Sequence, residues 1–202
     1  ALEGITRGVT ITGDVMSDAL QFAASKATTH SKILDRLDLQ PQGYLLATVH
    51  RSENTDNIER LKNILAALTV LNEPVIFPVH PRTRKKIAEF GLLNPQSEIR
   101  NLKFIDPVGY FDIIALEKSA RLLLTDSGGM QKEAYWLKVP CITLRDETEW
   151  IETVELGWNI LTGDDRDRII ETVRTFKPPS EHPSLYGDGQ AAAQCLKALL
   201  AS

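Results

Sequence analysis

Residues 121–133 combine a short apolar run, a turn and a helix-forming segment in which several side chains could do chemistry. The apolar run ends at Thr125, and the helix-forming segment begins at Met130. A strand, turn and helix of this kind would present free backbone N–H groups at the positive end of the helix dipole, where anions bind. The residues that would face such an anion are Ser127, Gly128 and Gly129. Glu133 lies one turn into the helix, on the side that could reach a sugar hydroxyl.

The alternative is a Gly-rich turn that serves only packing, and this segment alone leaves both interpretations open. Its pattern is neither the G-x-G-x-x-G of dinucleotide-binding turns nor the G-x-x-x-x-G-K-[ST] of P-loops. If the turn binds a ligand, we expect a diphosphate site of another kind.

The elements that must position this turn alternate regularly between strand and helix. Apolar residues in the segment 57–71 recur at spacings of three and four, which is typical of a helix, and Thr55 or Asp56 is available as its N-cap. The predicted strands are 9–12, 44–49, 75–79, 99–105, 122–125, 141–144 and 158–161. The predicted helices are 15–27, 57–71, 83–90, 110–119, 130–137, 148–156, 165–176 and 190–200. This alternation predicts an α/β fold, a doubly wound parallel sheet with helices on both faces.

Polar side chains follow four of these strands at the point where each strand ends. They are His50 and Arg51, His80, Asp126 and Ser127, and Arg145. In open α/β sheets ligands bind beyond the carboxyl ends of the strands, so we expect these residues on one rim. A histidine after a strand is more often structural than functional, but four such positions together favour a site for an anionic ligand. No pair of carboxylates and no nucleophile with its base is evident among them, so this rim is predicted to hold phosphates.

The bulk composition excludes several classes of function. The 202 residues, with 43% hydrophobic and 25% charged residues, are typical of a globular protein. A net charge of −4 argues against a nucleic-acid surface, and no apolar run is long enough to span a membrane. Cys141 and Cys195 lie far apart without CxxC spacing, which favours two buried reduced thiols in a cytoplasmic protein and predicts no metal site. No cofactor motif is present. The chain begins at Ala1 without methionine, which would fit an upstream segment that has been removed or a processed start.

Five ordered motifs resemble those of the non-hydrolysing UDP-N-acetylglucosamine 2-epimerases. Residues 47–54 (ATVHRSEN) resemble the family's T-x-H-R-x-E-N, and residues 78–81 (PVHP) its P-x-H-x-N/P turn. Residues 126–134 (DSGGMQKEA) resemble D-S-G-G-x-Q-E-E-A. Residues 144–149 (LRDETE) match R-D-x-T-E, and residues 186–191 (YGDGQA) match the start of the last helix. All five belong to the C-terminal half of the family's enzymes.

The resemblance implies a Rossmann-like half of a glycosyltransferase-B fold, in which two such domains face each other across a cleft. Residues 1–202 would form the C-terminal nucleotide-sugar-binding domain, and an N-terminal domain that carries the catalytic carboxylates would be missing. The family's isomerases remove the C2 proton of UDP-GlcNAc while UDP departs from C1, and UDP then adds back to give UDP-ManNAc. The isolated domain is therefore expected to fold without epimerising. The family would place the protein in cell-surface polysaccharide biosynthesis, in the cytoplasm, as a full-length homodimer.

The resemblance also implies a role for each matched residue. Ser127, Gly128 and Gly129 would bind the diphosphate, Glu133 the ribose hydroxyls, and Arg145 would neutralise phosphate charge or brace its loop. His50 would be the catalytic residue, beside the diphosphate and hexose, where it stabilises UDP as it leaves. Arg51 and His80 match positions that meet a second, activating UDP-sugar in some members. The segment 106–113, including Val108 and Ile113, would hold uracil mainly through main-chain groups.

Departures from the family pattern leave the hexose open. Ser52 replaces a frequent arginine, and Trp150-Ile151 replaces a frequent Arg-Pro, as in archaeal members and in relatives that act on UDP-2,3-diacetamido-glucuronic acid. Glu53, Glu147 and Glu149 are not expected to substitute for the missing catalytic carboxylates, because a Glu near a helix start usually caps it or faces solvent. Two alternative functions remain at this stage. One is the nucleotide half of a glycosyltransferase-B sugar transferase, and the other is a non-catalytic nucleotide-sugar-binding module.

Overall fold

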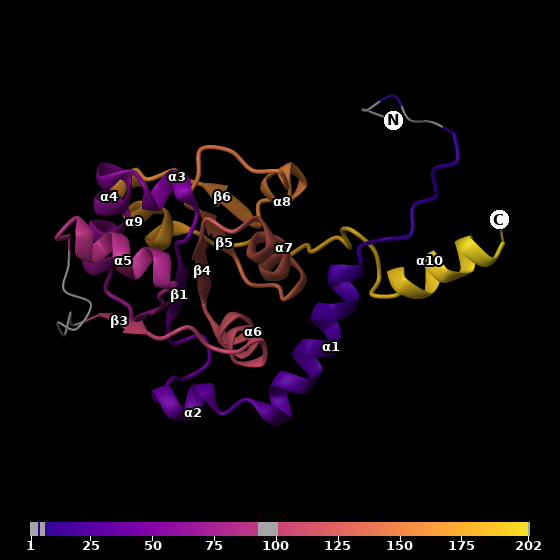
Figure 1. Ribbon diagram of the computed structural model, residues 1–202, viewed down its shortest axis with the longest axis horizontal. Coiled ribbons are helices and arrows are strands. Elements are labelled where there is room, and N and C mark those ends of the chain that lie inside the picture. Colours follow the sequence, from indigo (N-terminus) through magenta and orange to yellow (C-terminus); the bar gives the residue numbers. More distant parts are fainter. Residues whose placement is uncertain (1–3, 5–6, 93–100, 202) are drawn as a thin grey trace.

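A parallel sheet runs through the centre of the computed structural model, which describes residue 4, residues 7–92 and residues 101–201 (Figure 1). Its strands are β1 (Leu45–Thr48), β2 (Val75–Pro78), β3 (Leu102–Ile105), β4 (Leu122–Thr125), β5 (Cys141–Thr143) and β6 (Asn159–Leu161). They pair in the order β3-β2-β1-β4-β5-β6, and every pairing is parallel. The predicted doubly wound α/β fold is therefore confirmed.

Most of the helices cover the two faces of this sheet, and the last one extends away from it. The helices are α1 (Val15–His30), α2 (Ile33–Leu37), α3 (Ser52–Thr55), α4 (Ile58–Thr69), α5 (Pro81–Glu89), α6 (Tyr110–Ser119), α7 (Gly128–Trp136), α8 (Ile151–Glu155), α9 (Arg166–Thr175) and α10 (Ala191–Leu200). Within the described residues, no helix is long and apolar enough to cross a membrane.

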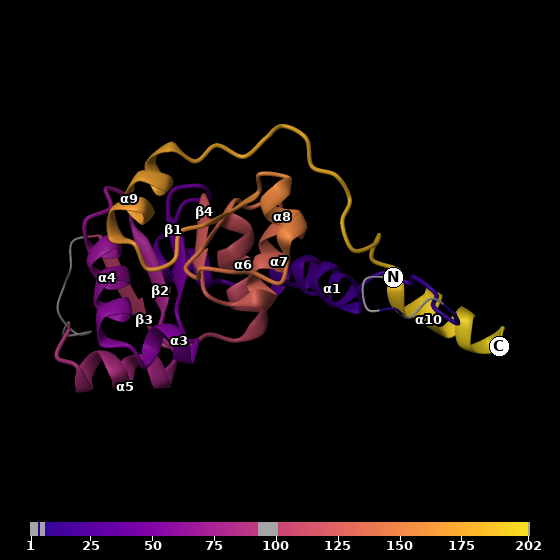
Figure 2. The ribbon, with the colours of Figure 1, turned by 90° about the horizontal axis from the view of Figure 1, so that it is seen from above.

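Two apolar clusters form the core, one on each face of the sheet. Leu45 and Ala47 point to one face and Leu46 to the other, because successive side chains of a strand alternate. The first face packs against α4, α5 and α9, and the second packs against α2, α6 and α7, as Figure 2 shows from above. Burial on both faces explains why these strands are continuous apolar runs in the sequence.

The strand order places the carboxyl ends of β1 and β4 side by side at the point where the order of the strands reverses. From β1 the chain proceeds outward through β2 to β3, and it then returns to β4 on the other side of β1. In open α/β sheets this switch point is where ligands bind. The loop after β1 carries His50 and Arg51, and the turn after β4 carries Asp126 and Ser127.

The structure corrects three predictions about helices and strands. Residues 9–12 form no strand, and Ile11 is 91% exposed, because a short apolar run becomes a strand only where a neighbouring strand pairs with it. The short helices α2 and α3 have too few turns to show a periodicity and were not predicted. The N-cap of α4 is Asn57, whose side chain accepts hydrogen bonds from the Glu59 and Arg60 N–H groups, so neither Thr55 nor Asp56 caps it. Residues 99 and 100 of the predicted strand 99–105 lie outside the described residues.

The terminal helix α10 extends away from the sheet and packs beside α1 (Figures 1 and 2). Asp18 of α1 accepts hydrogen bonds from the Ala191 and Ala192 N–H groups and so caps α10. Much of the apolar stripe of α10 is exposed, with Leu196 at 58% and Leu200 at 80%. Apart from Ala191, which is buried, these apolar side chains of α10 therefore lie outside the core of this domain. Neither cysteine forms a disulfide; Cys141 is buried as predicted, whereas Cys195 is half-buried, which corrects the prediction of two buried thiols.

Candidate functional site

The loop after β1 and the turn after β4 are joined by the carboxylate of Asp126. This side chain is fully buried, and it accepts hydrogen bonds from the His50 N–H at 3.0 Å and the Arg51 N–H at 3.0 Å. Asn54 donates a third bond to it at 3.1 Å and a further bond to the Leu144 carbonyl at 2.9 Å. Asp126 therefore acts as an anchor that fixes the backbone of three strand ends relative to one another.

Helix α7 begins directly after this anchor. Ser127 is the N-cap, and its hydroxyl accepts a bond from the Met130 N–H at 3.4 Å. No described residue accepts a hydrogen bond from the N–H groups of Gly128 and Gly129, which are the first two residues of the helix. A Cβ on Gly129 would make only ordinary van der Waals contacts, with Met16 Cε and Ser127 Oγ at 3.8 Å. The predicted anion-binding turn thus has two unpaired donors at the positive end of a helix.

Glu133 lies further along α7, and the Tyr110 hydroxyl of α6 donates a hydrogen bond to its Oε1 at 3.3 Å. Burial raises the pKa of the Glu133 carboxyl, and the hydrogen bond from Tyr110 opposes that rise. Burial, with Glu133 as a further charge, raises the pKa of the Tyr110 hydroxyl to about 12. Glu117, also on α6, is fully buried and neither of its oxygens has a partner among the described residues. Burial, together with the neighbouring charge of Glu133, raises the pKa of the Glu117 carboxyl well above its ordinary value.

The two residues predicted to lie at a uracil site are only partly buried. Val108 belongs to the loop between β3 and α6, and Ile113 lies on α6. Both side chains pack on the apolar cluster that covers one face of the sheet. They flank Tyr110 in the sequence, so this loop and helix start adjoin the Glu133 end of the site.

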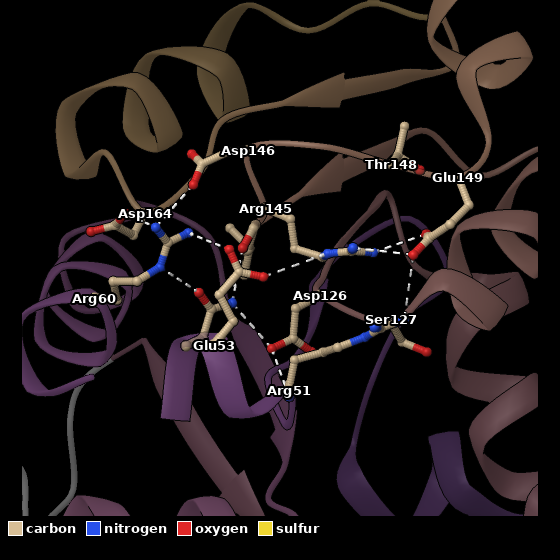
Figure 3. Close-up of polar contacts among 12 residues, drawn as sticks. Arg51, Glu53, Arg60, Asp126, Ser127, Arg145, Asp146, Thr148, Glu149 and Asp164 are labelled. Carbon is tan, nitrogen blue, oxygen red and sulfur yellow. Dashed lines mark hydrogen bonds and ion pairs between the residues drawn. The ribbon is translucent and has the colours of Figure 1, made fainter. Parts of the chain in front are cut away.

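Arg145, at the end of β5, is buried and held by a carboxylate on its own loop. Its Nη1 and Nη2 lie 2.9 and 3.1 Å from the two oxygens of Glu149, a bidentate pair (Figure 3). These hydrogen bonds raise the pKa of Arg145 and lower the pKa of Glu149. Arg51 reaches the same carboxylate, with Nη2 at 3.9 Å from Oε1. Glu53 lies 4.0 Å from Arg145 Nε, so two arginines and two carboxylates meet above the turn.

The two histidines predicted at this rim lie near each other. The ring centroids of His50 and His80 are 6.1 Å apart, and His50 Nε2 is 4.0 Å from Asp126 Oδ1. His80 is the N-cap of α5, where its Nδ1 accepts a bond from the Arg82 N–H at 3.2 Å. Its Nε2 therefore carries the proton in the neutral ring. No group of three potential metal ligands occurs within the described residues.

Several residues of this region were not predicted from the sequence. Asn54 was seen only as a motif position, but it joins Asp126 to the end of β5. Lys132 is 3% exposed, pairs with Asp14 and lies 4.1 Å from the ring centroid of Trp150. Its spacing of four from Trp136, whose ring is 5.1 Å away, is the one signal in the sequence that indicates such a contact.

Comparisons with known proteins agree on one family. Residues 2–200 match the family described as UDP-N-acetylglucosamine 2-epimerase. A UDP-N-acetylglucosamine 2-epimerase homolog of Methanococcus maripaludis is 49% identical over 98% of this chain and 56% of its own length. A UDP-2,3-diacetamido-2,3-dideoxy-D-glucuronate 2-epimerase of Pseudomonas aeruginosa is 43% identical over 90% of this chain and 50% of its own length.

A solved structure shares the fold over the whole chain. The UDP-GlcNAc 2-epimerase of Methanocaldococcus jannaschii, in complex with UDP-GlcNAc and UDP, is 38% identical and gives a TM-score of 0.89. The match covers 100% of this chain and 57% of that one. The chain thus spans about half the length of the curated relatives that it matches.

Proposed function

This chain belongs to the UDP-N-acetylglucosamine 2-epimerase family, and we propose that it is the UDP-binding half of an enzyme that interconverts UDP-GlcNAc and UDP-ManNAc. The observation that carries the proposal is the start of α7. Two unpaired N–H groups, of Gly128 and Gly129, lie at a helix N-terminus at the switch point of the sheet. Arg51 reaches over the same turn from β1.

A UDP molecule fits the order of groups along this region. The diphosphate would bind Ser127, Gly128 and Gly129, with Arg51 and Arg145 supplying positive charge. Glu133, further along α7, would accept hydrogen bonds from the ribose hydroxyls in place of the Tyr110 hydroxyl. Uracil would then lie against the segment 106–113, where Val108 and Ile113 offer apolar contacts next to main-chain groups. The M. jannaschii relative in complex with UDP-GlcNAc and UDP supports this choice of ligand.

His50 would stabilise UDP as it leaves the hexose. Its side chain is 42% exposed, and its backbone is fixed by Asp126 beside the diphosphate turn. His80 stands 6.1 Å away between ring centroids, and with Arg51 it would meet a second UDP-sugar that activates the enzyme.

Removal of the C2 proton is assigned to the N-terminal half. The carboxylates near the rim are engaged elsewhere: Asp126 is buried under three donors, and Glu149 and Glu53 face arginines. A general base needs a free lone pair within reach of the proton that it abstracts. We therefore expect this chain alone to bind UDP without epimerising a UDP-sugar.

The test compares the chain with a protein that contains it together with an N-terminal half. Incubation with UDP-GlcNAc is followed by NMR of the C2 configuration, without any acceptor sugar. We expect UDP-ManNAc from the longer protein and none from the 202-residue chain. Conversion only in the presence of an acceptor would instead identify a sugar transferase, and turnover by the chain alone would show that the chemistry has been assigned to the wrong half.

The hexose and the partners are part of the same proposal. The 43% identity to the P. aeruginosa enzyme makes a diacetamido-uronic acid substrate the second candidate.

The exposed apolar side chains of residues 9–16 and α10 would contact the N-terminal half. The complete protein would be a cytoplasmic homodimer that serves cell-surface polysaccharide synthesis. Light scattering over a concentration series should show the 202-residue chain as a monomer or a weak self-associate.

A further inference from the structure

The carboxylate of Glu149 lies over the first residue of α7. Its Oε2 is 3.3 Å from the position that a Cβ on Gly128 would take. Both of its oxygens are paired with Arg145, and Oε1 is 3.9 Å from Arg51. A negatively charged group of this chain thus stands at the helix N-terminus, between the two arginines that the proposed diphosphate would contact (Figure 3).

The N–H donors around Glu149 make no hydrogen bond to its carboxylate. No described residue accepts a bond from the Gly128 or Gly129 N–H, and the buried indole Nε1 of Trp150 has no partner in the described part of the chain. This Nε1 is 3.4 Å from the same Cβ position on Gly128. Buried donors normally have an acceptor, so this set indicates that an anion with more oxygens than one carboxylate belongs here.

The backbone around Glu149 is held to α7, whereas its side chain is open to solvent on one side. Thr148 Oγ1 donates to Gln131 of α7 at 2.5 Å, and the Trp150 N–H donates to Thr148 Oγ1 at 3.0 Å. The Glu149 side chain is 50% exposed, and the Arg145 side chain opposite is 5% exposed. The carboxylate can therefore leave for solvent by rotation of its own side chain, while Arg145 keeps its place.

We propose that Glu149 occupies the phosphate position at the start of α7 in the ligand-free protein, and that a nucleoside diphosphate displaces it on binding. This inference rests on the proposed binding of UDP at this turn. Glu149 keeps the buried Arg145 paired until the ligand arrives, which avoids an uncompensated buried charge. Displacement opposes binding, so Glu149 lowers the affinity for the diphosphate and speeds its release.

The test is the affinity of the 202-residue chain for UDP and for inorganic pyrophosphate, measured by calorimetry with Glu149→Gln. The amide still accepts a bond from Arg145 but carries no charge to compete with phosphate. A half-exposed charge of this kind changes affinity modestly, so we expect both ligands to bind roughly three- to fivefold more tightly. Glu171→Gln is the control, because it makes the same charge change at an exposed residue of α9, whereas the charge of Glu147 on the shared loop itself acts on Arg145. It should leave both affinities close to those of the parent chain.

Weaker binding by Glu149→Gln would overturn the inference, since it would show that Glu149 orients Arg145 for the ligand. Unchanged binding would overturn it too, since it would show that Glu149 does not compete with the ligand. An equal gain in ligand affinity in the two variants would also overturn the inference, because the effect would then come from net charge alone. If Glu149→Gln does not fold, Glu149→Asp withdraws the carboxylate by one methylene and should also tighten binding. Absence of UDP and pyrophosphate binding by the parent chain would refute the proposed function itself, an outcome distinct from these.

Discussion

Replacing Glu133 by glutamine should weaken UDP binding while leaving inorganic pyrophosphate binding nearly unchanged. In the structure Glu133 Oε1 accepts a hydrogen bond from Tyr110 at 3.3 Å, a long bond that a ribose hydroxyl can replace. The amide of glutamine keeps one acceptor oxygen and loses the other, together with the charge. A charge-assisted hydrogen bond contributes about 1.5–3 kcal/mol, which corresponds to roughly a 10- to 150-fold loss of affinity.

Calorimetry with the two ligands separates the ribose contact from the phosphate contacts. Tyr110→Phe serves as the control, because it removes the hydroxyl that competes for Glu133 and retains the ring. This variant should bind UDP at least as well as the parent chain. Equal losses for UDP and pyrophosphate in Glu133→Gln would refute the ribose assignment, because pyrophosphate has no ribose to contact.

Three further predictions concern the turn, the buried acid and the anchor. Gly129→Ala should stabilise α7 by up to about 1 kcal/mol in thermal melts, since its Cβ makes only ordinary van der Waals contacts at 3.8 Å. It should nevertheless weaken UDP binding by narrowing the phosphate approach, and tighter UDP binding would contradict this. Glu117 has a native pKa raised above its unfolded value, so the native state retains a proton that the unfolded state releases, and stability should fall as pH rises above about 4.5. Glu117→Gln should flatten that slope in urea titrations between pH 4.5 and 8, and an unchanged slope would show that another group causes it. Asp126→Asn should cost roughly 3 kcal/mol of unfolding free energy, because the buried site loses its charge and one of its two acceptor oxygens becomes an amide nitrogen that cannot accept from the His50 N–H; chemical denaturation with an undiminished midpoint would argue against the anchor role.

Much of the fold followed from local patterns along the chain. The buried strands are continuous apolar runs and the helices have apolar residues at spacings of three and four, so most elements were placed within a few residues of their bounds. The predicted segments 110–119 and 122–125 coincide with α6 and β4. The same rule wrongly predicted a strand at residues 9–12. An apolar run is necessary for a buried strand, but pairing with a neighbouring strand decides whether one forms.

The rim of the site could also be predicted in outline. Parallel strands bring their carboxyl ends to one edge, so residues that follow β1, β2, β4 and β5 had to lie there together. The sequence also placed the Ser-Gly-Gly turn directly before a helix predicted to begin at Met130, and in the structure the helix begins two residues earlier, at Gly128, with Ser127 as its N-cap.

Only the tertiary structure decided which of these polar groups pair with one another. Asp126 looked like a ligand-facing residue after its strand, yet it is fully buried under the N–H groups of His50 and Arg51. Glu149 looked like a capping or surface residue, yet its carboxylate lies over Gly128 and holds Arg145. Sequence patterns show which residues are apolar and at what spacing they recur. That spacing determines which helices and strands form and which of their faces is buried. The partner of a charged side chain depends on distances of a few ångströms between strand ends that are far apart in the chain, and these distances exist only once the sheet has assembled.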